Sequence, residues 1–207
     1  MSDILHQFIT GLKQTSFLEF VAVICGIVSV WFSRKENILV YPIGLVNTVI
    51  YIYISIKGNL FGEASVNVYY TIMSVYGWML WSKKDESKHA VLVIKRSSLK
   101  EWIGHLAFFA TFYVSIFLAL SYLQKEFAPG AIPAADAFAS ATAYTGMWLM
   151  AQKKVESWYW WILTNIASIP LYFVKGYVFT SFQFIILLVM AFAGLMAWHK
   201  KATDARG

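Results

Sequence analysis

Long apolar segments dominate this chain and constrain its fold more than any other feature. Seven such blocks run over residues 17–33, 37–56, 64–82, 102–124, 134–152, 157–174 and 177–198. A helix needs about 20 apolar residues to cross the hydrocarbon core of a bilayer, and 59% of the 207 residues are hydrophobic. We therefore predict an all-α membrane protein with seven transmembrane helices and no separate soluble domain.

The distribution of positive charge predicts the orientation of these helices. With seven spans, four Lys residues fall on the side of the N-terminus: Lys13, Lys57, Lys125 and Lys175. The other thirteen of the 17 Lys and Arg residues fall on the opposite side. Because cytoplasmic loops carry the excess of positive charge, we expect the N-terminus outside and the C-terminus in the cytoplasm. The net charge of +6 then reflects topology and not nucleic-acid binding.

Two parts of the sequence repeat each other. Asn47 and Asn165 lie in the middle of apolar blocks and are 118 residues apart, and Trp81 and Trp198 close the following blocks at an offset of 117. Duplicated hydrophobic units are a common way to build transporters, with the substrate held between the units.

The repeats define three regions of the chain. Residues 17–82 and 133–199 form the two three-helix repeats, and residues 83–132 contain a cytoplasmic loop, a linking fourth helix and an outer turn. Because one helix lies between the repeats, they run in the same direction. We therefore predict a 3+1+3 arrangement of parallel repeats like that of the SWEET sugar transporters.

Amide side chains within the apolar blocks mark a candidate binding site. Asn47 and Asn165 lie near the midplane of the second and sixth helices, and Asn67 and Gln183 lie about one turn from the outer ends of the third and seventh. Amides in hydrocarbon are costly unless they are paired. One interpretation is a polar cavity between the repeats, and the other is hydrogen bonding between helices.

Aromatic and hydroxyl side chains accompany these amides at helical spacing. The further candidates for substrate contact are Trp158, Trp161, Tyr172, Tyr51, Thr71, Trp78 and Tyr144. Aromatic walls with a few polar groups suit a small planar ring that bears hydroxyls and an amide. No Lys or Arg lies on these faces, which disfavours a phosphorylated ligand. Glu63 and Asp136 are interpreted as solvated helix ends, or as groups that favour the entry of cations.

The remaining tryptophans are expected at the membrane interface, where amphipathic rings gather. This expected belt consists of Trp31, Trp81, Trp102, Trp160 and Trp198.

Catalytic functions lack the residues that they require. The chain contains no Gly-rich phosphate loop, nucleophile–base pair or metal-ligand cluster, and Cys25 is its single cysteine. We expect no enzyme activity, no cofactor and no metal.

One motif is specific enough to indicate a family. The sixth helix reads Trp158-x-x-Trp161-x-x-x-Asn165, and the third contains the segment from Tyr76 to Trp81. Together they resemble the PnuC family of bacterial nicotinamide riboside transporters, over the whole chain. The resemblance makes Trp158, Trp161 and Asn165 the first candidates for substrate contact.

The same resemblance implies further properties. It implies a SWEET-like fold, facilitated diffusion of nicotinamide riboside across the bacterial inner membrane for NAD biosynthesis, and a homotrimer. Two alternatives stay open. The chain could carry another vitamin or a sugar, or it could be a membrane receptor or the membrane subunit of a larger complex.

Overall fold

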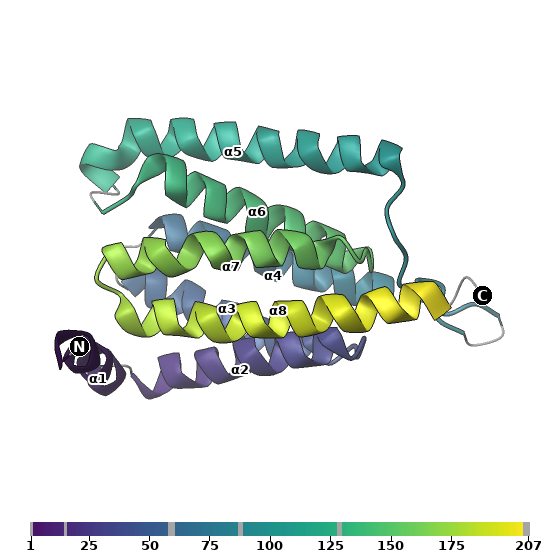
Figure 1. The fold of residues 1–207 in the computed structure, drawn as a ribbon, viewed down its shortest axis with the longest axis horizontal. Helices are drawn as coiled ribbons and strands as arrows, with labels where there is room; N and C mark the ends of the chain where they lie inside the picture. Colours follow the sequence, from purple (N-terminus) through teal and green to yellow (C-terminus); the bar gives the residue numbers. More distant parts are fainter. Residues whose placement is uncertain (1, 15, 58–60, 87–88, 128–129, 205–207) are drawn as a thin grey trace.

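The computed structural model describes residues 2–14, 16–57, 61–86, 89–127 and 130–204. Its regular structure consists of helices that lie largely side by side, with the termini at opposite ends (Figure 1). The helices in the described residues are α1 (Ser2–Gln14), α2 (Phe17–Arg34), α3 (Val40–Lys57), α4 (Phe61–Trp81), α5 (Leu99–Phe127), α6 (Pro133–Ala151), α7 (Ser157–Val174) and α8 (Val178–Asp204). Helices α2 to α8 correspond to the seven apolar blocks.

Helix α1 was not predicted from the sequence. It packs against the start of α8, where the ring of Phe8 lies 5.7 Å from that of Phe179 and 5.3 Å from that of Phe182. With 13 residues, α1 is too short to cross a bilayer.

Four of the described helices are long and apolar enough to cross a membrane. They are α2, α3, the Leu99–Tyr122 part of α5, and α8. Helices α4, α6 and α7, with 21, 19 and 18 residues, are not among these four. Helix α6 is rich in Ala, Thr and Gly and is buried along most of its length. Small residues of this kind permit close packing between membrane helices.

Six helices pack in a closed ring. Within each half, α2–α3–α4 and α6–α7–α8 contact in sequence, and the halves meet where α4 packs on α6 and α2 packs on α8. Helix α5 packs mainly on α6 and lies along its outer side in Figure 1. Its Phe112 and Phe109 rings also reach Tyr69 of α4 and Trp160 of α7, with centroids 6.1 and 5.2 Å apart. The contacts within the ring are symmetric. If α2, α3 and α4 change places with α6, α7 and α8, respectively, the same pairs of helices are in contact.

Side chains repeat this correspondence where α2, α4, α6 and α8 end, which we call the C-terminal end of the bundle. A methyl group added at Gly77 would overlap the ring of Tyr41, and one added at Gly194 would overlap the ring of Trp158. Both glycine–ring pairs are related by an offset of 117 residues. Glycine is therefore required at both positions so that an aromatic ring can lie against the helix backbone.

Two tryptophans complete this end by bonding across the halves. The Trp81 indole N–H donates to the Ala151 carbonyl at 3.1 Å, and the Trp198 indole N–H donates to the Ser33 carbonyl at 3.0 Å. Both acceptors lie in the last turn of a helix, where carbonyls lack helical partners.

The prediction of an interfacial belt is therefore wrong for three tryptophans. Trp198 is 0% exposed, Trp160 5% and Trp81 7%. They are buried between helices because their large apolar rings leave water on folding, and the indole N–H groups of Trp81 and Trp198 also donate to helix-terminal carbonyls. Trp31 is 41% exposed, and the belt stays a prediction there and at Trp102.

The segment before α5 is fastened to the turn between α6 and α7. The backbone N–H of Lys95 donates to the Lys153 carbonyl, and that of Val155 donates to the Lys95 carbonyl, both at 3.1 Å. Glu156 Oε2 accepts from Ser97 N at 2.9 Å and from Ser97 Oγ at 2.8 Å. Helix α5 begins directly after this segment, at Leu99.

Candidate functional site

Asn165 is a buried amide in the middle of α7. The residue is 4% exposed, and within the described part of the chain its side chain makes no hydrogen bond. Ser168, nearly one turn further along α7, is 2% exposed. The amide therefore keeps its hydrogen-bonding groups available, and Asn165 is suited to bind a polar ligand.

Aromatic rings from three helices form a connected group that begins one turn from this amide. Trp161, one turn from Asn165, has its ring centroid 6.2 Å from that of Tyr70 on α4. Tyr70 is 6.3 Å from Tyr144 on α6, which stacks on Tyr69 at 4.1 Å and an interplanar angle of 26°. The Tyr69 hydroxyl donates to the Tyr144 carbonyl at 3.0 Å. The structure therefore brings the predicted residues Trp161 and Tyr144 together through Tyr70.

Sequence reasoning missed Tyr69 and Tyr70. The signal was present, because this aromatic pair follows Asn67 by two and three residues in a helix already chosen for its polar face. The sequence analysis assigned that face to Thr71 and Trp78, and Thr71 directly follows Tyr70 in the chain.

Asn47 has a different role from Asn165, although the two are related by the repeat. The Asn47 Nδ2 donates to the Ala22 carbonyl at 2.7 Å and joins α3 to α2. A Cβ atom at Gly26 would lie 3.0 Å from this nitrogen, so a glycine there leaves room for the amide. Hydrogen bonding between helices, one of the two interpretations of the amides, describes Asn47.

Other predicted residues lie around this centre in separate contacts. The Thr71 hydroxyl on α4 is 2.9 Å from the Thr48 hydroxyl on α3. Tyr172 stacks on Phe184 of α8 at 5.2 Å, with an interplanar angle of 24°. The side chains of Asn67, Tyr51 and Gln183 are half-buried on α4, α3 and α8, respectively.

Two predicted tryptophans are not brought to the rings around Trp161. Trp158 is 1% exposed, lies against Gly194, and meets the Trp198 ring edge-on at 5.6 Å. It belongs to the core at the C-terminal end of the bundle. Trp78 is 39% exposed and lines a shallow cavity with Val75, Met79 and Ser82.

One of the two acidic residues considered for cation entry, Asp136, is ion-paired. Asp136 Oδ1 accepts from Lys175 Nζ at 2.6 Å, and its other oxygen accepts from the Ile132 backbone N–H at 2.6 Å. The Asp136 side chain is 19% exposed, so it is an ion-paired group and not a freely solvated helix end. The side chain of Glu63 lies outside the described residues.

A comparison with known families supports this reading of the fold. Residues 16–200 match the model of the family described as nicotinamide mononucleotide transporter. The chain belongs to this family. The resemblance to PnuC transporters is thereby confirmed. The matched residues include nearly all of helices α2 to α8.

Several relatives of this transporter family have curated functions. The chain is 25% identical over 209 residues to the nicotinamide riboside transporter PnuC of Escherichia coli, with 91% of this chain and 87% of the relative covered. It is 26% identical over 196 residues to the PnuC protein of Neisseria mucosa, with 89% and 73% covered. A riboflavin/roseoflavin transporter, RibM of Streptomyces davaonensis, is 21% identical over 182 residues, with 87% and 83% covered.

A solved member shares the fold. The crystal structure of the vitamin B3 transporter PnuC superposes with a TM-score of 0.75 at 22% identity, and covers 97% of this chain and 88% of that one. The similarity confirms an all-helical membrane transporter fold for the family member described here.

Proposed function

We propose that this chain transports nicotinamide riboside, with the substrate bound beside Asn165 between the two halves of the ring. The observation that carries the proposal is the buried Asn165 amide, which lacks a hydrogen bond to any described residue and lies one turn from Trp161. The curated relatives from Escherichia coli and Neisseria mucosa, matched over most of their length, support the same substrate.

The chemistry of the proposed site suits this ligand. Nicotinamide riboside has a cationic pyridinium ring, a carboxamide and ribose hydroxyls. The aromatic faces of Trp161, Tyr70 and Tyr144 attract a cation, and the Asn165 amide can pair with the carboxamide or a hydroxyl.

The site favours a riboside over a phosphorylated nucleotide, although the family's description names the mononucleotide. A phosphate group is usually held by Arg, Lys or a helix N-terminus. The lysine at the end of α7, Lys175, is already paired with Asp136 at 2.6 Å. A phosphate brought beside Asn165 would therefore be desolvated without a partner cation.

We also propose the membrane architecture. The exchangeable contacts of α2–α4 and α6–α8 support two parallel three-helix repeats joined by α5, which gives seven spans in the SWEET-like 3+1+3 order. The distribution of Lys and Arg supports an inner-membrane protein with its N-terminus outside. A cytoplasmic reporter fused after Gly207 is expected to be active and one fused after Lys125 inactive, and the reverse would overturn this orientation. The family resemblance adds a homotrimer.

The positions of the acidic residues support the proposal of transport by facilitated diffusion. In the described side chains of α2 to α8, carboxylates occur only near helix ends: Glu19, Glu101, Asp136 and Asp204. Ion-coupled carriers usually place ionisable groups within the membrane. Proteoliposomes with a clamped membrane potential should equilibrate nicotinamide riboside without a proton or sodium gradient, and gradient-dependent accumulation would contradict this.

Calorimetric titration of the purified protein tests the substrate. Nicotinamide riboside should bind, whereas nicotinamide mononucleotide should bind much more weakly. Trp161→Ala should weaken riboside binding by about 1–2 kcal/mol, the scale of a desolvated cation–π contact. Trp31→Ala is the matched control, because Trp31 is exposed on α2 and belongs to the expected belt.

The outcome separates the two candidate vitamins. Binding of riboflavin without binding of nicotinamide riboside would favour the second candidate, which the similarity to RibM supports. Equal riboside affinity in Trp161→Ala and the parent protein would show that the site lies elsewhere.

A further inference from the structure

Two residues with an unusual backbone conformation face each other at the C-terminal end of the bundle. Glu36, after α2, has φ 60°, and Lys153, after α6, has φ 53°. They are 117 residues apart and therefore occupy equivalent positions in the two halves. Positive φ is uncommon for residues other than glycine, and here it occurs at the same point of both turns.

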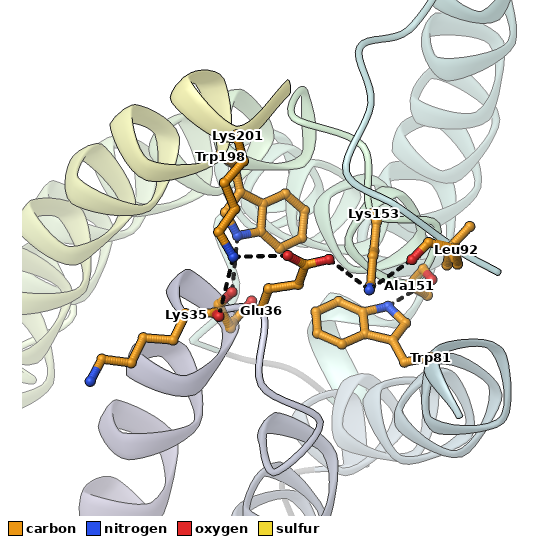
Figure 2. A network of polar contacts seen from close by, with 9 residues as sticks. Lys35, Glu36, Trp81, Leu92, Ala151, Lys153, Trp198 and Lys201 are labelled. Atoms are coloured by element: carbon orange, nitrogen blue, oxygen red, sulfur yellow. Dashed lines mark hydrogen bonds and ion pairs between the residues drawn. The ribbon is translucent and has the colours of Figure 1, made fainter. Parts of the chain in front are cut away.

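The two side chains are paired across the ring of helices at the C-terminal end of the bundle, a place that we call the C-terminal mouth of the ring (Figure 2). Glu36 Oε1 accepts from Lys153 Nζ at 2.8 Å, and Glu36 Oε2 accepts from Lys201 Nζ on α8 at 2.8 Å. The Lys153 ammonium also donates to the Leu92 carbonyl at 2.8 Å and lies 4.7 Å from the centre of the Trp81 ring. One carboxylate thus ties the first half of the ring to two elements of the second.

Burial makes this cluster stronger than an ordinary surface ion pair. The Lys153 side chain is 5% exposed, that of Glu36 23% and that of Lys201 46%. Exposed pairs contribute little to stability, whereas removing one partner of a buried pair leaves an uncompensated charge. Burial alone would raise the pKa of the Glu36 carboxyl, but the hydrogen bonds and charges of Lys153 and Lys201 lower it overall.

The cluster also borders a cavity that can supply water to it. This cavity has a volume of about 650 Å³ and is lined by Glu36, Trp81, Lys84 and Lys153 among others. A permanent seal could be built from apolar side chains, which often replace buried ion pairs without loss of stability. Charged groups differ because water can solvate them once they separate, so the contact can break and re-form.

We propose that Glu36, Lys153 and Lys201 form a charge lock that closes the C-terminal mouth of the ring and opens to release substrate on that side. The lock rests on the proposed function in one respect, namely that the transport route runs between the two halves. Its opening separates the α2–α3 turn from the α6–α7 turn and from the end of α8.

Distance measurements between spin labels test the lock without any substrate. Nitroxides are attached at Ser82→Cys, after α4, and at Lys200→Cys, on α8, in a Cys25→Ser background, because both sites are exposed and belong to different halves. Pulsed electron paramagnetic resonance should show mainly a short distance in the labelled parent. Glu36→Gln, which weakens both pairs, should raise the ratio of long to short distances about tenfold.

Further variants give a graded series. Lys153→Met should have a smaller effect than Glu36→Gln, because Lys201 still holds the carboxylate, and Lys201→Met should have the smallest effect because its side chain is the most exposed. Lys153→Arg, which keeps the charge, should retain the short distance. Glu101→Gln is the matched control, since Glu101 pairs with the neighbouring Lys154 but does not join the two halves.

The possible results separate the lock from the transport proposal. An unchanged distance distribution in Glu36→Gln and Lys201→Met would overturn the lock, as would an equal shift in Glu101→Gln. Nicotinamide riboside is titrated into the labelled parent in parallel. Failure of this protein to bind it would overturn the proposed substrate, while the distances would still decide whether the charge pairs hold the mouth closed.

Discussion

The two halves of the ring are alike at one end and different in the middle. At the C-terminal end of the bundle, Tyr41 lies over Gly77 as Trp158 lies over Gly194. In the middle, Asn47 donates to the Ala22 carbonyl at 2.7 Å, whereas its counterpart Asn165 is buried without such a bond. The same residue type therefore serves helix packing in one half and is left available in the other.

This difference shows which parts of a duplicated fold are fixed by the scaffold. The glycine–ring contacts are needed twice because each half must bring its helices together in the same way. A ligand with distinct ring, amide and sugar groups is itself asymmetric, so equivalent positions in the site need not keep equivalent roles. Matched substitutions in the two halves test which equivalent positions keep equivalent roles.

Truncating the buried tryptophans should have the largest effect. Trp198→Ala and Trp81→Ala each remove a buried ring and a hydrogen bond to the other half. The expected loss is about 3–5 kcal/mol in the free energy of unfolding, measured by thermal or denaturant unfolding in detergent. Similar losses in both variants would support equivalence, whereas a stable Trp81→Ala would restrict the tryptophan contact to the second half.

A single methyl group should distinguish the packed glycines from an open one. Gly194→Ala and Gly77→Ala force a ring away from the helix and should each cost about 1–3 kcal/mol of stability. Gly104→Ala on α5 is the control, because no atom lies within 4 Å of the added group. It should be neutral or slightly stabilising, since alanine favours helix. The unfolding temperatures of the three variants test this prediction. Equal temperatures would show that the Tyr41 and Trp158 rings do not lie closely against Gly77 and Gly194.

The paired asparagines should separate binding from stability. Asn165→Leu should lower the affinity for nicotinamide riboside by about 1–3 kcal/mol, because a polar substrate group loses its partner, with little change in unfolding. Asn47→Leu should instead lower stability by about 1 kcal/mol and keep the affinity. Calorimetry and unfolding of both variants test this crossed pattern. Parallel behaviour of the two would mean that both amides serve the same purpose.

The smallest expected effect is a dependence of stability on pH. The pKa of Glu36 is lowered from its ordinary value of 4.5, so its ion pairs stabilise the folded protein above that value. This contribution is lost as the pH falls through the lowered pKa. The parent should therefore lose more stability than Glu36→Gln between neutral and acid pH. Identical pH profiles for the two proteins would show that the carboxylate contributes nothing.

Helices α2 to α8 could be predicted from the sequence because a long apolar run is a local pattern. Helix α1 was missed because its 13 residues alternate polar and apolar groups and form no long apolar run. Trp198 was misplaced because a tryptophan near a helix end has the same local sequence whether it faces lipid or a neighbouring helix. Asn47 and Asn165 could be paired by sequence, but only the fold reveals that Ala22 supplies a partner to one of them.

The hydrogen bonds from Lys95 to the α6–α7 turn divide the molecule unevenly. Helix α5 packs on α6 and is anchored at its start by Lys95 and Ser97, so it travels with the second half during any opening of the ring. The boundary between the part of the chain that moves with the first half and the part that moves with the second therefore lies before Leu92, and not midway between the repeats. A split within residues 83–91 would leave the helices of both moving bodies whole, and the backbone bond from the Val91 N–H to the Lys83 carbonyl would still join the two fragments. That stretch is therefore where two co-expressed fragments should reassemble most readily.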